Sequence, residues 1–132
     1  SEGTTSYLAA RAIEAIAGVD EGNKIWAEYE QSLNRVIHDD DRIAWPQTCG
    51  EIDVLTDLWN NVPYMKGAFF YRAVEKAVGR DAIDRALASF YEQYKGQAAG
   101  MKDMLDTIKR ETGFDANELA KGWLSSLGRP DA

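Results

Sequence analysis

Apolar residues recur every three or four positions along most of this 132-residue chain, which predicts helices rather than strands. Glycine, proline and clustered acidic residues interrupt the pattern and indicate where the helices end. Residues 38–50 predict a loop, whereas residues 51–60 fit either a strand or a short helix, of which we favour the helix. The helices predicted elsewhere span residues 7–17, 21–37, 62–78, 81–94, 101–111 and 116–127.

Most of the predicted helices carry one apolar face that would point into a shared core. These faces comprise Ile25, Trp26, Tyr29, Leu33, Val36 and Ile37, then Ile83, Leu87, Phe90, Tyr91 and Tyr94, then Met101, Met104, Leu105 and Ile108, and finally Leu119, Trp123 and Leu127. Asn61 is a candidate N-cap, and residues 115–118 resemble a capping box. Helices joined by short glycine-containing turns are typical of an all-α orthogonal bundle, and no unit recurs with a fixed period. We therefore predict a single helical domain over residues 1–132.

The composition argues against several classes of function. The net charge is −7 and the basic residues are scattered, which argues against nucleic-acid binding. No apolar run is long enough to span a bilayer and Ser1 does not open a signal-peptide pattern, so no membrane partner is expected. The single cysteine, Cys49, excludes an internal disulfide and fits a reducing compartment. A cytoplasmic location is therefore favoured, while a secreted or periplasmic one stays open.

Three features outside the apolar faces of the helices could take part in chemistry, but each is better explained as an ordinary loop or surface feature. Cys49 has no activating partner that the sequence reveals, so we interpret it as an inert loop thiol. His38 is the only histidine, and zinc-binding histidines need partners at fixed spacing, so we expect a surface side chain. The three aspartates at 39–41 lack the spacing of a calcium-binding loop, which favours a solvated turn.

The stretch Val-Pro-Tyr-Met-Lys-Gly at residues 62–67 is the strongest candidate for chemistry. Pro63 suits the first turn of a helix, so Tyr64 stands at a helix opening. A phenol there can donate its hydroxyl proton to a developing oxyanion. Gly67 follows one turn later and permits another backbone to come close. The alternative is that Tyr64 is only the edge of an amphipathic core.

Together with Ser-Glu-Gly at residues 1–3, this stretch resembles two motifs of the gluzincin aminopeptidases, the family of aminopeptidase N and the leukotriene hydrolases. In that family a Trp-Leu-Asn/Ser-Glu-Gly stretch supplies the third zinc ligand. A later Val-x-Tyr-x-Lys-Gly or Val-Pro-Tyr-Glu-Lys-Gly stretch supplies the tyrosine that stabilises the tetrahedral intermediate. The resemblance implies that Glu2 is a zinc ligand and that Tyr64 is the catalytic hydroxyl.

The same resemblance gives supporting roles to Gly3, Lys66 and Gly67, with Lys66 either pairing with an acidic neighbour or staying solvated. The chain departs from the second motif at Met65, where an acidic residue is common. The similarity continues through Phe-Tyr-Glu-x-Tyr at 90–94 and through Trp-Leu followed by Gly-Arg-Pro within 123–130.

Two family motifs, His-Glu-x-x-His and Gly-x-Met-Glu-Asn, do not occur in the sequence. The resemblance therefore implies the C-terminal helical half of a thermolysin-like catalytic domain, whose partners are a peptide substrate and an N-terminal lobe. We expect zinc in the intact enzyme and neither tight zinc binding nor activity in this fragment alone. We also expect an exposed apolar patch near Glu2 and Tyr64, through which the chain could self-associate.

A non-catalytic helical interaction module is the competing interpretation, and an upstream His-Glu-x-x-His would decide against it. Peptide hydrolysis and epoxide opening both fit the motifs, and the substrate residue preferred at the cleaved end stays open.

Overall fold

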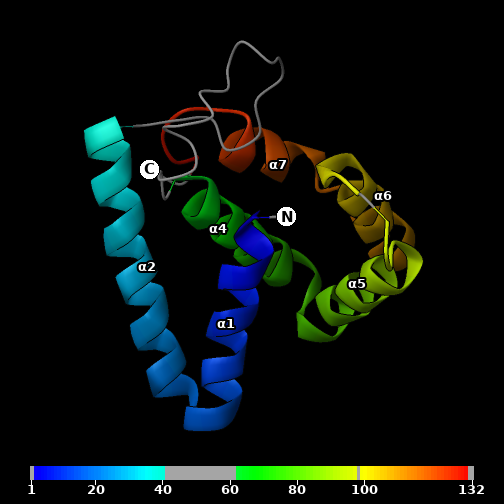
Figure 1. Cartoon of the computed structure of the whole chain (residues 1–132), viewed down its shortest axis with the longest axis horizontal. Helices are drawn as coiled ribbons and strands as arrows, with labels where there is room; N and C mark the ends of the chain where they lie inside the picture. Colours follow the sequence, from blue (N-terminus) through cyan, green and yellow to red (C-terminus); the bar gives the residue numbers. More distant parts are fainter. Residues whose placement is uncertain (1, 41–61, 98, 131–132) are drawn as a thin grey trace.

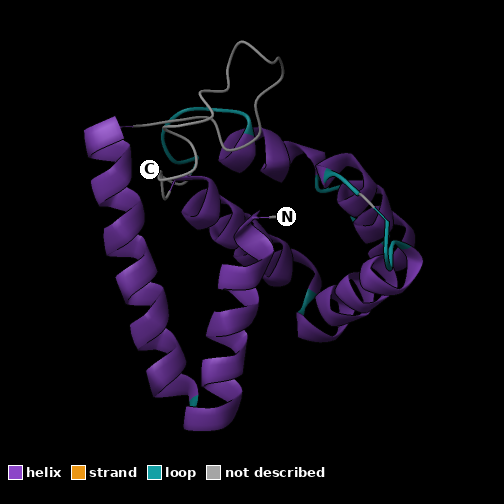
Figure 2. Ribbon diagram, in the orientation of Figure 1, coloured by secondary structure: helices purple, strands orange, loops and turns teal. Residues whose placement is uncertain are grey.

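The computed structural model describes residues 2–40, 62–97 and 99–130. Within these residues the chain is helical and contains no strand (Figure 2), which confirms the predicted all-α fold. The helices are α1 (Glu2–Ala17), α2 (Val19–Asp40), α4 (Val62–Val78), α5 (Arg80–Gln93), α6 (Met101–Thr112) and α7 (Asn117–Leu124).

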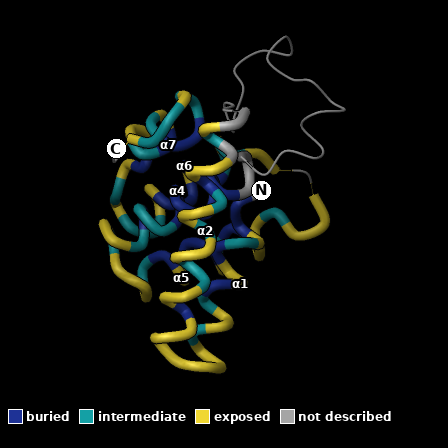
Figure 3. Tube along the Cα trace, turned by 90° about the vertical axis from the view of Figure 1, so that its left-hand side faces the viewer, coloured by how far each residue is buried: buried dark blue, intermediate teal, exposed yellow. Residues whose placement is uncertain are grey.

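Helix α4 is the centre of the bundle. It contacts α1, α2, α5 and α7, while α1 also contacts α2 and α5 also contacts α6. Figure 1 shows α1 and α2 as an antiparallel hairpin beside α4, with α5 and α6 as a second hairpin on the other side. Exposed residues gather at the tip where α1 meets α2, and the buried ones lie along α4 (Figure 3).

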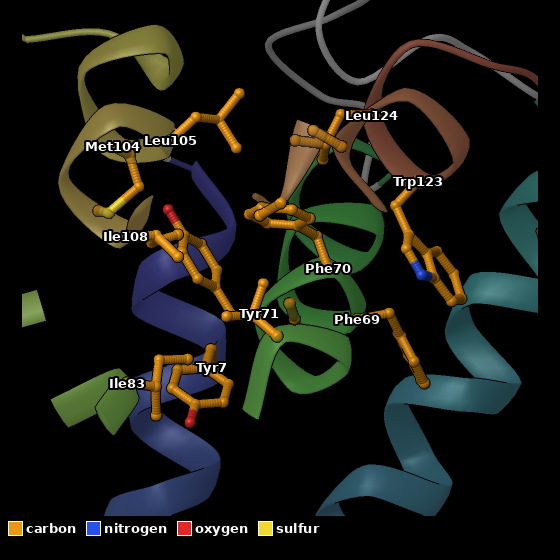
Figure 4. Close-up of a cluster of buried hydrophobic side chains, with 14 of the residues drawn as sticks. Tyr7, Phe69, Phe70, Tyr71, Ile83, Met104, Leu105, Ile108, Trp123 and Leu124 are labelled. Atoms are coloured by element: carbon orange, nitrogen blue, oxygen red, sulfur yellow. The ribbon is translucent and has the colours of Figure 1, made fainter. Parts of the chain in front are cut away.

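The sequence of α4 explains its central position. Its residues from Met65 to Tyr71 are all buried, so the helix is covered on every side rather than along one stripe. Phe70 and Tyr71 point towards the side chains of α6, whereas Phe69 points towards Trp123 of α7 (Figure 4). Neighbouring helices therefore share a single core built around α4.

Most predicted helix boundaries agree with the structure, and glycines set two of them. Gly18 and Gly79 have φ angles of 100° and 90°, which favour glycine and separate α1 from α2 and α4 from α5. The predicted loop is wrong at 38–40, because α2 continues through Asp40. Its remainder, the short helix at 51–60, Cys49 and Asn61 lie outside the described residues.

Two predicted core residues and the predicted capping box need correction. Tyr91 is 49% exposed because Phe90 and Leu87 face the core and Tyr91 falls beside them. Leu127 is 64% exposed because α7 ends at Leu124. The N-cap of α7 is Ala116, and the Asp115 carboxylate instead accepts a hydrogen bond of 2.9 Å from the backbone N–H of Asn117.

Candidate functional site at the start of two helices

The two residues with predicted chemical roles lie at the beginnings of two packed helices. Glu2 is the first residue of α1, and Tyr64 is the third residue of α4. An acidic residue at this end of α1 is stabilised by the helix dipole, and Pro63 fits the first turn of α4 because its missing N–H has no partner to lose. The local sequence is thus compatible with helix at both positions.

The glycine of each motif contacts the other at the point where α1 and α4 cross. A Cβ atom added to Gly67 would lie 2.6 Å from the Cα atom of Gly3 and 2.9 Å from its nitrogen. A Cβ atom on Gly3 would overlap the backbone of Gly67 and lie 2.6 Å from the nitrogen of Ala68. Real Cβ atoms do not approach backbone this closely, so both positions require glycine.

This contact brings the two motifs together along the backbone. Glu2 directly precedes Gly3, and Tyr64 precedes Gly67 by three residues. At a rise of about 1.5 Å per residue, three residues span about 4.5 Å along a helix. The backbones of Glu2 and Tyr64 therefore both lie within about one helical turn of the crossing. The roles predicted for their side chains stay predictions.

Lys66 lies inside the protein rather than in solvent. Its side chain is fully buried, and its ammonium donates a 3.0 Å hydrogen bond to the backbone carbonyl of Ser126. The expectation that Lys66 stays solvated is therefore wrong. The bond joins the first turns of α4 to the segment that follows α7, so Lys66 helps to fix the position of the start of α4.

A polar network that the sequence did not reveal lies beyond the glycine contact, about one turn further along α1 and about two turns further along α4. The buried Tyr7 hydroxyl donates to Glu75 at 2.6 Å and accepts from the Arg11 guanidinium at 2.9 Å. Burial, and then the bond to Glu75, raise the pKa of Tyr7 well above its ordinary value. Tyr7 therefore stays protonated and acts in packing. The spacing of Tyr7 and Arg11, one turn apart on α1, was the available signal.

The described residues alone provide no complete metal site. They contain no group of three or more histidine, cysteine, aspartate or glutamate side chains close enough to hold an ion. His38 is exposed in the last turn of α2, which confirms the surface position predicted for it. None of the described helices combines the length and apolar character that a membrane span needs.

Helix α1 turns an apolar face to solvent. Leu8 and Ile13 are 38% and 37% exposed, and Ile16 is 85% exposed. Alanines at positions 9, 12 and 15 lie among them and are exposed too. These exposed apolar residues begin six residues after Glu2 and continue away from the glycine contact, so they are a different surface from the patch predicted near Glu2 and Tyr64, which stays a prediction.

The chain was then compared with known proteins. The Peptidase family M1 domain matches residues 1–123. Probable aminopeptidase 1 of Sulfurisphaera tokodaii is 25% identical over 76 residues, which cover 58% of this chain and 10% of that protein. Aminopeptidase M1-B of Oryza sativa subsp. japonica is 29% identical over 80 residues, covering 61% and 9% respectively.

A third relative is the Tricorn protease-interacting factor F2 of Thermoplasma volcanium, 23% identical over 78 residues, or 59% of this chain and 10% of that protein. The chain thus spans about a tenth of the length of these relatives. No solved structure matches the chain significantly.

Proposed function

The chain belongs to peptidase family M1, and from this membership we propose that it forms the helical part of the catalytic domain of a zinc-dependent aminopeptidase. The observation that carries the proposal is the contact between Gly3 and Gly67. It joins the two stretches that resemble the family's zinc-ligand and tyrosine motifs, although about sixty residues separate them in the chain.

The donor chemistry of Glu2 fits zinc as one ligand of several. Carboxylate oxygens bind zinc at catalytic sites, which take three protein ligands and leave one position open. The described residues offer no set of three, so the remaining ligands would come from another part of the intact protein. Zinc, when bound, would polarise the scissile carbonyl and make the attacking water more acidic.

Tyr64 would act where negative charge develops. Tyr64 belongs to the first turn of α4, which packs against α1, and helix N-termini favour negative charge. A phenol held there can donate its proton in a hydrogen bond to the carbonyl oxygen as that oxygen becomes an oxyanion. Gly3 and Gly67 would fix the spacing, and buried Lys66 would hold the α4 end of the site.

The apolar face of α1 fits the same proposal. Exposed aliphatic side chains such as Ile16 are unfavourable in water and mark a surface that another part of a protein covers. We infer that the remainder of the catalytic domain packs there. Alone, the 132-residue chain would then show no catalytic activity and would be prone to self-association through α1.

The deciding experiment is Tyr64→Phe in the intact protein, measured as aminopeptidase activity and zinc content. We expect kcat to fall by about 10²–10³, or roughly 2.7–4 kcal/mol, with little change in KM and no change in zinc content. Glu2→Gln should instead lower the zinc content, because it removes a ligand. Tyr91→Phe is the matched control, since Tyr91 is exposed on α5. Near-normal kcat with full zinc in Tyr64→Phe would make Tyr64 a packing residue.

A zinc titration distinguishes this proposal from the alternative that the 132-residue chain is a zinc protein on its own. We expect the 132-residue chain to bind zinc no more tightly than roughly micromolar, which corresponds to about −8 kcal/mol, because one carboxylate cannot chelate the ion. Calorimetry with zinc alone measures this. A one-to-one nanomolar site would contradict the proposal.

A further inference from the structure

A pocket of about 430 Å³ lies on the other side of α4 from the glycine contact. Its walls come from α2, α4, α7 and the segment after α7, and none of its lining residues belongs to α1. Two of them, Arg129 and Pro130, lie beyond residue 123, where the family match ends. The pocket therefore lies apart from the glycine contact beside which the proposed catalytic residues stand.

The floor of this pocket is aromatic. Phe69 and Trp123 stack with their ring centroids 5.5 Å apart and their planes 21° from parallel (Figure 4). Leu119 lines the pocket beside them. An apolar group in the pocket would contact Leu119 and the small exposed part of Phe69 and Trp123, which are 4% and 5% exposed, and the volume suits a small molecule or the end of a peptide.

Three cationic side chains, those of Arg72, Lys76 and Arg129, line the pocket together with the aromatic residues. The Arg72 guanidinium lies 4.7 Å from the ring centre of Trp26, and that of Arg129 lies 5.5 Å from the ring centre of Phe69. Stacking of this kind holds a planar guanidinium in a fixed orientation. Lys76 also lines the pocket. Across the part of the chain that is described, neither Arg72 nor Lys76 forms an ion pair, so both can accept an anion.

One carboxylate opposes these three cations. Glu30 lines the pocket and accepts a hydrogen bond of 3.2 Å from Arg129, whose guanidinium also donates to Asn34 at 2.9 Å. The Glu30 side chain is 51% exposed, so it stands at the rim. The lining therefore has an excess of positive charge, in a chain whose net charge is −7.

We propose that this pocket binds a ligand that carries one carboxylate on an aromatic or apolar body. A carboxylate fits the planar fork of an arginine through paired hydrogen bonds. Arg72 and Lys76 bind the carboxylate, while the body lies on Phe69 and Trp123.

The test is a titration of the ¹⁵N-labelled 132-residue chain with N-acetylphenylalanine and, separately, with its amide, followed by the indole N–H resonance of Trp123. The amide has the same body and nearly the same size, and it replaces the charged carboxylate by a neutral group. We expect the acid to bind with a dissociation constant of about 0.5 mM, near the lower end of ligand efficiency for a molecule of this size. The amide should bind at least about tenfold more weakly, and salt should reduce the difference.

Two substitutions that should change the affinity for the acid in opposite directions test the roles of the charged lining residues. Arg72→Gln should weaken binding of the acid about tenfold, whereas Arg85→Gln, the same change at an exposed position on α5, should leave it unchanged. Glu30→Gln should tighten binding of the acid about threefold, because it removes the opposing charge. A gain in affinity cannot arise from partial unfolding, so Glu30→Gln remains decisive if Arg72→Gln folds poorly.

Several results would overturn the proposal. The acid and the amide could bind equally well, or Arg85→Gln could weaken binding as much as Arg72→Gln. Glu30→Gln could leave the affinity of the acid unchanged. Absence of any shift of the Trp123 resonance at roughly tenfold the expected dissociation constant would have the same consequence. None of these measurements involves zinc or peptidase activity, so they are independent of the proposed function.

Discussion

Helices α1 and α4 meet in two places that are held together in different ways. At the start of both helices Gly3 and Gly67 touch through their backbones, with no side chain between them. About one turn further along α1 and two turns further along α4, the contact is polar: Tyr7 of α1 donates to Glu75 of α4, and Arg11 lies 3.7 Å from the same carboxylate. The first contact fixes how closely the helices approach, and the second adds directional bonds.

The difference predicts how each contact tolerates change. A backbone contact leaves no room for even one added methyl group, because the facing atoms cannot move without moving a helix. The polar network has several members, including a two-pronged pair between Arg11 and Asp84 of α5 with both distances 3.0 Å. Loss of one member leaves the others in place, so the energetic cost should be smaller.

The largest effect on stability is expected for Gly67→Ala. The new Cβ would stand 2.6 Å from the Cα atom of Gly3, so α1 and α4 must separate. Overpacking of this kind costs on the order of 3 kcal/mol, even though alanine favours the helix by about 1 kcal/mol. Urea unfolding followed by circular dichroism measures the loss.

Gly100→Ala provides the matched control for this substitution. Nothing lies within 4 Å of a Cβ atom added at Gly100, which precedes α6 with an ordinary negative φ of −109°. We expect a loss of less than about 1 kcal/mol there, from replacing a glycine N-cap by alanine. Equal losses at both positions would mean that the close approach of α1 and α4 does not limit stability.

The contrast between the two contacts also explains what the sequence could predict. The glycine contact was foreseeable as a close approach, because Gly67 belongs to a motif and stands one turn after Tyr64. That its partner would be Gly3 was not foreseeable from spacing, since about sixty residues intervene. Periodicity predicts which residues a helix buries and leaves open which other helix covers them.

The errors have local physical causes. Of the two expectations for Lys66, the solvated one is wrong: lysine seldom lies in an interior, yet Lys66 is buried and its ammonium donates to the backbone carbonyl of Ser126. Tyr91 was assigned to the core because it extends an apolar stripe, but that stripe is wider than the surface that α6 covers. The Arg11 network escaped prediction because its partners come from three helices.

The second largest effect is expected for Tyr7→Phe. The change removes the hydroxyl that donates to Glu75 at 2.6 Å and keeps the ring against Tyr71, 5.8 Å away between centroids. Glu75 is mostly buried, with 19% of its side chain exposed, and retains Arg11 and Arg80 as weaker partners. Loss of a hydrogen bond to a charged acceptor costs about 1.5–2 kcal/mol, measurable by the same unfolding experiment.

Tyr91→Phe tests whether that loss belongs to the buried bond. Tyr91 is half exposed and contacts Phe90 edge-on, with 5.8 Å between centroids, so its hydroxyl faces water. We expect a change within about 0.5 kcal/mol. If Tyr7→Phe changed the free energy of unfolding as little as Tyr91→Phe does, the Tyr7–Glu75 network would contribute little to stability. The polar contact between α1 and α4 would then not be a second stabilising contact beside the glycine contact.

The smallest effect concerns pH and the ion pair at the far end of α1. Arg80 of α5 donates to both oxygens of Glu14, at 2.8 and 2.6 Å. These bonds hold the pKa of the Glu14 carboxyl below its ordinary value of 4.5. Because the unfolded chain then binds the proton more readily, the pair stabilises the fold above that value, and the contribution is lost as the pH falls through the lowered pKa.

The pair should contribute little, because the Arg80 side chain is 48% exposed and water screens it. We expect Glu14→Gln to be less stable than the natural chain by about 0.5 kcal/mol at pH 7, with the difference shrinking between pH 5 and pH 3 and also in high salt. Unfolding by urea at each pH measures it. Glu92→Gln, an exposed change on α5, should show no such dependence. If the difference in the free energy of unfolding instead grew towards pH 3, the protonated form of the Glu14 carboxyl would be the stabilising one, contrary to this prediction.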